Sequence, residues 1–148
     1  MRRVFTLGSI LVVFVVCTAC DESLTKLAGP TPNLEPTFAS VQSEVFEKTD
    51  DAGRPACVNC HTTVGRTPAG GMVLEHAAAY DQIVNVRSVE HPELMRIAPG
   101  NPDASYLVHK VEGRSSIVGA RMPLRGPYLT DGQIVILRRW IELGAPRN

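Results

Sequence analysis

The sequence predicts a mostly α-helical domain. Apolar residues recur at helical spacing in several segments of the 148-residue chain, and the last of these segments is framed by strong capping signals. No stretch alternates apolar and polar residues over the length of a convincing strand. Length and apolar content fit one globular domain. Lys plus Arg and Asp plus Glu balance at 15 each, which argues against a disordered chain and against a nucleic-acid-binding protein.

The chain begins with the features of a bacterial export signal. Residues 1–19 hold two arginines, an apolar run that is short for a bilayer span, and small residues before Cys20. This boundary resembles a lipobox, where a bacterial lipoprotein is cut before a lipid-bearing cysteine, although Cys17 stands where leucine is usual. We expect Cys20 to be lipidated, with ordinary signal cleavage or an uncleaved anchor as the alternative. The folded part would then lie on the periplasmic or cell-surface side of a bacterial membrane.

A linker is expected over residues 20–36. This stretch contains three prolines and few apolar side chains, which is the composition of a tether between a membrane anchor and a domain. The domain itself is therefore predicted over residues 37–148, without internal repeats.

The first predicted helix follows this linker. Phe38, Val41, Val45 and Phe46 recur at helical spacing, and Thr37 can act as the N-cap. Residues 50–56 then bring charge, Gly and Pro, which predicts a loop.

Two further helices are expected in the middle of the domain. One presents a face made of Val73, Ala77, Tyr80 and Val84. The other begins at Asn101 as N-cap, has Pro102 at its first position, and stops at Gly113. Residues 82–91 between them are compatible with a short extended segment.

The last predicted helix has the clearest boundaries. Thr130 and Gln133 form a capping box, while Gly144 and Pro146 mark the end. Its broad apolar face predicts packing on two sides, and consists of Ile134, Ile136, Leu137, Trp140, Ile141 and Leu143.

Cys57, Cys60 and His61 form a CxxCH motif, which is compatible with a covalent haem, a zinc ion or a disulfide. Two thiols three positions apart can add to the two vinyl groups of a porphyrin, while the following imidazole reaches the iron. An exported chain is where such attachment occurs. The motif therefore favours one covalently bound haem c.

Zinc and a redox disulfide remain the alternatives. Structural zinc needs four ligands, and the sequence offers no second cysteine pair once Cys17 and Cys20 are accounted for. His76, His91 and His109 are scattered singly. A redox disulfide would favour a strand before the motif, which the sequence does not predict.

Met122 is the strongest candidate for a second axial ligand of the iron. It lies in a Gly- and Pro-rich loop before the last helix, and Pro123 favours an extended backbone at Met122. Met72 is close to the motif in sequence but is poorly placed to reach the opposite side of the haem. Met95 is flanked by apolar residues and is expected to pack in the core.

The order of these features resembles the class I cytochrome c family: a helix, CVNCH, intermediate helices, a Met122-Pro123 loop and a closing helix. More narrowly, PGNPDASYLVHKVEG, RMP and LTDGQIVILRRWIELGA resemble the single-haem modules of planctomycete-type and related bacterial lipoproteins. The resemblance implies an all-α class I cytochrome c-like fold around one haem. Cys57 and Cys60 would be thioether attachments, His61 the proximal ligand and Met122 the distal one, with Phe46 near Trp140.

The expected function is that of an exported monohaem c-type cytochrome rather than an enzyme. It would transfer single electrons between membrane-associated or periplasmic redox partners that dock transiently. Alternatives are a haem enzyme or gas or redox sensor with an open or displaceable sixth iron ligand, and a subunit whose haem only stabilises the fold. Arg121 and Arg125 are either partners of a haem propionate or solvated charges. Trp140 either lies beside the porphyrin or belongs to the core.

Overall fold

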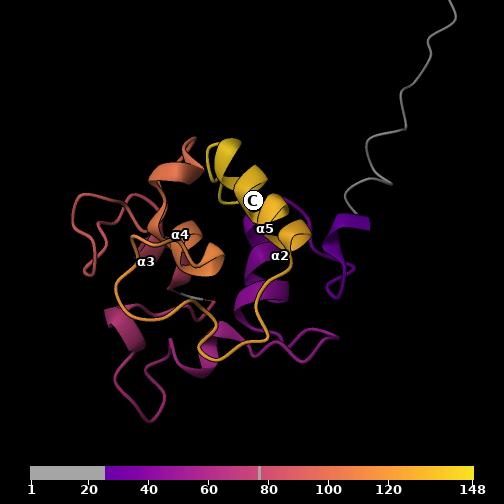
Figure 1. Cartoon of the computed structure of the whole chain (residues 1–148), viewed down its shortest axis with the longest axis horizontal. Helices are drawn as coiled ribbons and strands as arrows, with labels where there is room; N and C mark the ends of the chain where they lie inside the picture. Colours follow the sequence, from indigo (N-terminus) through magenta and orange to yellow (C-terminus); the bar gives the residue numbers. More distant parts are fainter. Residues whose placement is uncertain (1–25, 77) are drawn as a thin grey trace, which may run out of the picture.

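The computed structural model describes residues 26–76 and 78–148, so the predicted signal, Cys20 and Ala77 lie outside the description. The described part is helix-rich, as predicted (Figure 1). Its extended pairing is limited to isolated bridges, and none of its helices is long and apolar enough to cross a membrane. The elements in chain order are α2 (Phe38–Val41), the π-helix η1 (Gln42–Phe46), the 3-10 helices η2 (Cys57–Asn59) and η3 (Ala69–Gly71), α3 (Ala79–Ile83), the 3-10 helix η4 (Pro102–Ala104), α4 (Tyr106–Glu112) and α5 (Asp131–Glu142).

Helix α5 and the segment formed by α2 and η1 lie side by side in the core (Figure 1). Thr37 caps α2 as predicted, because its side chain accepts a hydrogen bond from the Ser40 amide at 3.2 Å. The rings of Phe38 and Trp140 are 5.8 Å apart. The resemblance implies that Phe46 lies near Trp140, and both residues are buried in the same core, where the ring pairing with Trp140 is made by Phe38.

Helix α5 begins as predicted. The Gln133 amide donates to Thr130 Oγ1 at 3.2 Å, and the Thr130 amide donates to Gln133 Oε1 at 2.8 Å, which completes the capping box. The end is marked by Gly144, whose φ of 95° suits a residue without Cβ. The predicted apolar face was one residue too wide, because Leu143 is the C-cap residue and 52 % of it is exposed.

The helix predicted from Asn101 to Gly113 is divided into η4 and α4. Asn101 caps the start and Gly113 ends the second part in a left-handed conformation, as predicted. Between them Ser105 is extended, with φ −100° and ψ 108°. The break has a non-local cause, because the Tyr106 amide donates to the Met95 carbonyl at 2.8 Å instead of to a helical carbonyl.

The helix predicted over residues 73–84 is shorter, because α3 covers only Ala79–Ile83. At its start the Leu74 amide donates to the His61 carbonyl at 2.9 Å, which keeps this part of the chain outside a helix. At its end Val84 is extended and forms an isolated bridge with a later segment. Such bridges are the short extended structure expected within residues 82–91.

Residues 26–36 pack against the domain, although their composition predicted a linker. Ala28, Thr31 and Leu34 are 0, 2 and 2 % exposed. A Cβ at Gly132, near the start of α5, would overlap the Leu27 carbonyl, so glycine permits this close approach. The folded unit therefore begins before residue 37, and the predicted boundary was too late.

Candidate functional site

The CxxCH motif forms one tight turn made of η2 and the two residues after it. The Cys60 and His61 amides both donate to the Cys57 carbonyl, at 3.2 and 3.0 Å. Cys57 and Cys60 are free thiols, the first half-buried and the second exposed. The structure thus brings together the three motif residues that the sequence predicted to act jointly.

Cys57 carries a protonated thiol in an apolar environment. Its Sγ donates to the Val45 carbonyl at 3.4 Å. Burial raises the pKa of Cys57 to about 11, although the charge of Arg54 acts in the opposite direction. A thiol with so high a pKa is a poor redox nucleophile at neutral pH, whereas a thioether sulfur is uncharged and tolerates burial. This environment suits covalent attachment better than a reactive disulfide.

His61 presents a neutral imidazole. Burial lowers the pKa of His61, while the backbones of Ala69 and Met72 beside the ring oppose this shift. The neutral ring is the form that binds a metal. Within the described residues, His61 Nδ1 is buried and has no hydrogen-bond partner. A buried nitrogen of this kind is one that a bound group can satisfy.

The loop before the motif is held by a buried ion pair. Arg54 is 0 % exposed, and its Nε donates to Asp50 Oδ2 at 3.1 Å. Its remaining donors reach backbone carbonyls, including those of Glu44 at 3.0 Å and Val45 at 3.1 Å. Burial alone would raise the pKa of Asp50, but hydrogen bonds from the Arg54 amide and the Gln133 side chain hold it below its usual range. The loop is therefore a fixed connection between η1 and the motif.

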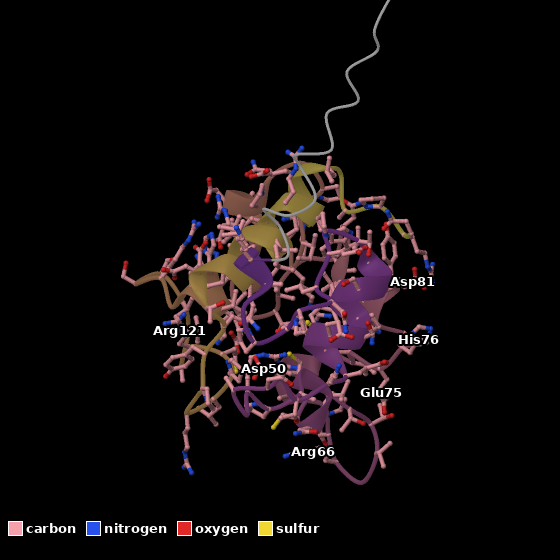
Figure 2. The ribbon with its side chains drawn as sticks, turned by 90° about the vertical axis from the view of Figure 1, so that its right-hand side faces the viewer. Asp50, Arg66, Glu75, His76, Asp81 and Arg121 are labelled. Carbon is pink, nitrogen blue, oxygen red and sulfur yellow. The ribbon has the colours of Figure 1, made fainter. Side chains whose placement is uncertain are left out.

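A carboxylate clamps the loop after the motif. Glu75 Oε1 accepts from Thr62 Oγ1 at 2.6 Å, and Glu75 Oε2 accepts from Thr63 Oγ1 at 3.2 Å. These hydrogen bonds, the one from Thr62 above all, lower the pKa of Glu75. Figure 2 shows Glu75 and Arg66 together near one end of the molecule. The chain leaving His61 is thus also held by side-chain hydrogen bonds, which are more exposed than the Arg54–Asp50 pair on the other side of the motif.

The loop that carries Met122 is attached to α4. Met122 is half-buried, and its amide donates to the Lys110 carbonyl at 2.9 Å. Beside it, Arg121 Nε donates to the Val111 carbonyl at 2.8 Å and the guanidinium lies 4.2 Å from the centre of the Tyr128 ring. Arg121 therefore has protein partners of its own.

Lys110, which binds the Met122 loop, also influences the charge state of His61 in the motif. The Glu90 carboxylate raises the pKa of His61 and the Lys110 ammonium lowers it, so both charges act on the imidazole. The Met122 amide is bonded to the backbone of the same lysine. Lys110 thus acts on His61 through its charge and binds the Met122 loop through its backbone.

The other candidate side chains from the sequence analysis range from fully buried to exposed. Trp140 is fully buried and its indole donates to the Pro146 carbonyl at 3.0 Å, which agrees with the core interpretation. Met72 is half-buried against the core. Met95 is also only half-buried, and Arg125 is exposed.

The three remaining histidines differ in burial. His109 is buried, with Nε2 2.7 Å from the Asp103 carbonyl. His91 is paired with Glu93 at 2.9 Å, and His76 is exposed. Among residues 26–76 and 78–148, no three His, Cys, Asp or Glu side chains gather so as to hold a metal ion.

Sequence reasoning missed the polar residues that fix the site. Asp50 and Arg54 were interpreted only as loop charge, and Glu75, Glu90 and Lys110 were not considered. Their roles depend on partners distant in the chain, and no local pattern marks a charged residue as buried. The closeness of Arg54 to the motif in sequence was the one available signal.

Comparisons of the chain with protein-family models, with curated proteins and with solved structures found no match. The function is therefore argued from the residues of the chain itself.

Proposed function

We propose that this chain is an exported monohaem c-type cytochrome that carries single electrons. The observation that supports this most strongly is the CxxCH turn, which combines two free thiols with a neutral, half-buried imidazole whose Nδ1 is buried. The helix-rich architecture is compatible with the class I cytochrome c fold that the sequence resembles.

The residues present fit a covalent haem. Cys57 and Cys60 would form the thioether bonds, and His61 would be the proximal ligand of the iron. Met122 would be the distal ligand, held on a loop that is bonded to α4. When bound, the haem would supply a one-electron ferric–ferrous couple.

The protein's contribution is to keep both ligands in place in both oxidation states. The motif is fixed by Arg54 on one side and by Glu75 on the other, so little rearrangement would accompany electron transfer. Thioether ligation and apolar neighbours stabilise ferrous iron, because the ferric state carries the additional charge. Cys57, Val58 and Met72 pack at the edge of the core. We therefore expect a moderately positive reduction potential.

Location and partners follow from the N-terminal sequence. A lipid on Cys20 would hold the domain at the outer side of a bacterial membrane, near membrane-associated or periplasmic redox proteins. Redox partners of this kind associate through small interfaces and separate quickly. No nucleic-acid partner is proposed.

The test is the optical spectrum of the full chain, expressed with a haem-attachment system, in oxidised and reduced states. We expect a covalent low-spin haem with a methionine-to-iron absorption band that resists carbon monoxide. Met122→Ala should abolish the band and admit carbon monoxide, since it removes the distal ligand. Met95→Ala is the matched control and should retain both properties.

Each other outcome has a definite meaning. A wild-type haem that is high-spin or binds carbon monoxide readily would favour an enzyme or a sensor. A band that is lost in Met95→Ala but kept in Met122→Ala would show that Met95, and not Met122, is the distal ligand. Absence of covalent haem in the wild type would overturn the proposal.

A further inference from the structure

Glu90, Tyr106 and Lys110 form a partly buried polar cluster, the Lys110 cluster, which the proposed function has not used. Lys110 Nζ lies 3.0 Å from Glu90 Oε2, and the Tyr106 hydroxyl donates to the same oxygen at 3.0 Å. The Lys110 side chain is 12 % exposed and Tyr106 is 5 % exposed, while the Glu90 side chain is 35 % exposed. A charged pair with one partner largely removed from water is screened less than a fully exposed pair.

The Lys110 cluster holds both backbone groups of one loop residue, Val118. Lys110 Nζ donates to the Val118 carbonyl at 2.8 Å, and the Val118 amide donates to the Tyr106 hydroxyl at 2.9 Å. Val118 itself is 53 % exposed, so burial of its side chain contributes little to holding it. The polar contacts therefore determine where this part of the loop lies.

The same lysine holds the loop again four residues later. The Met122 amide donates to the Lys110 carbonyl at 2.9 Å. Lys110 thus contacts the loop through its side chain at Val118 and through its backbone at Met122. The loop between these two positions is fixed to α4 at both ends.

We propose that the Lys110 cluster is the positioning device for the Met122 ligand. Lys110, Glu90 and Tyr106 act through the loop backbone and keep the thioether directed toward the iron, without touching the iron themselves. This inference rests on the proposed function, because it assumes that Met122 ligates.

The test compares haem-loaded full-chain variants. Lys110→Met keeps the long apolar stem and removes the ammonium, so we expect less than half of the methionine-to-iron band at neutral pH and at least tenfold tighter carbon monoxide binding. Tyr106→Phe and Glu90→Gln should shift both properties in the same direction, and Lys110→Arg should restore most of the band. Lys48→Met is the matched control, since it removes a lysine that pairs with Glu44 at 3.1 Å and is 53 % exposed, and it should behave as the wild type.

Hydrogen exchange of the full chain as expressed supplies a readout independent of the band. The Val118 and Met122 amides should exchange at least tenfold faster in Lys110→Met than in Lys48→Met, while amides of α5 stay protected, which separates loop release from general unfolding. An unchanged band and unchanged exchange would overturn the inference, as would faster exchange with an intact band. If the wild type holds covalent haem without the methionine band, the ligand role of Met122 fails. Absence of haem would overturn the function itself, and with it this inference.

Discussion

At the scale of single residues, the two cysteines of one motif occupy different environments. Cys60 is exposed, while Cys57 lies against the core and donates to the Val45 carbonyl. The sequence motif presents them as a symmetrical pair, because spacing carries no information about burial. The reactivity of the two thiols in the haem-free chain should therefore differ.

Alkylation of the haem-free chain should modify Cys60 well before Cys57. With a pKa of about 11, roughly one Cys57 side chain in a thousand is a thiolate at pH 8, and only the thiolate reacts. The rate at Cys57 should rise up to about pH 11. The unfolded chain ionises this thiol near the ordinary value of 9.0, so the free energy of unfolding should fall between pH 9 and 11. Mass mapping of modified peptides checks the rates, and equal rates at pH 8 would contradict the prediction.

At the scale of elements, local signals predicted the ends of helices and non-local contacts determined their interruptions. The capping box of α5 and the left-handed stop at Gly113 were read correctly, because capping depends on residues three or four positions apart. The break at Ser105 was not predictable, since it depends on pairing with Met95. The joint role of the motif residues was predicted from their spacing, whereas the buried Arg54–Asp50 pair beside the motif was not.

Replacing Arg54 with Met should destabilise the protein by about 3–5 kcal/mol, because it leaves the Asp50 carboxylate buried without its partner. The carbonyls of Glu44 and Val45 lose donors in the same variant. Urea denaturation measures the effect. Arg139→Met removes an exposed ion pair with Glu142, and should change stability by at most about 1 kcal/mol. Equal effects of the two substitutions would show that the buried pair does not hold the loop.

At the scale of the whole molecule, composition was a poor guide to where the folded unit begins. Prolines and polar residues in 20–36 are typical of a tether, yet Leu34 and Ala28 supply enough apolar surface for the second half of this stretch to pack. Gln133 of α5 contacts both Thr31 and Asp50, which joins this stretch to the loop before the motif. Such a junction of three distant segments has no signature in one sequence.

Leu34→Ala should therefore lower the free energy of unfolding by about 2–5 kcal/mol, as for a core leucine. A leucine in a free tether would have almost no effect. Leu27→Ala is the control, since Leu27 is 40 % exposed and its substitution should cost about 1 kcal/mol or less. Chemical denaturation of the full chain distinguishes the two, and a neutral Leu34→Ala would mean that residues 26–36 do not belong to the folded unit.

For the proposed lipid-anchored protein, the packing of residues 26–36 also sets how far the domain can travel from the membrane. With a lipid on Cys20, the chain up to Lys26 reaches at most about 20 Å, against roughly 60 Å for the seventeen residues of 20–36. The accessible volume falls with the cube of this length, by roughly 27-fold, and the local concentration seen by a neighbour in the same membrane rises accordingly. Electron exchange would then be fast with partners embedded beside it, and would depend on diffusion for soluble partners, which must themselves come to the membrane surface.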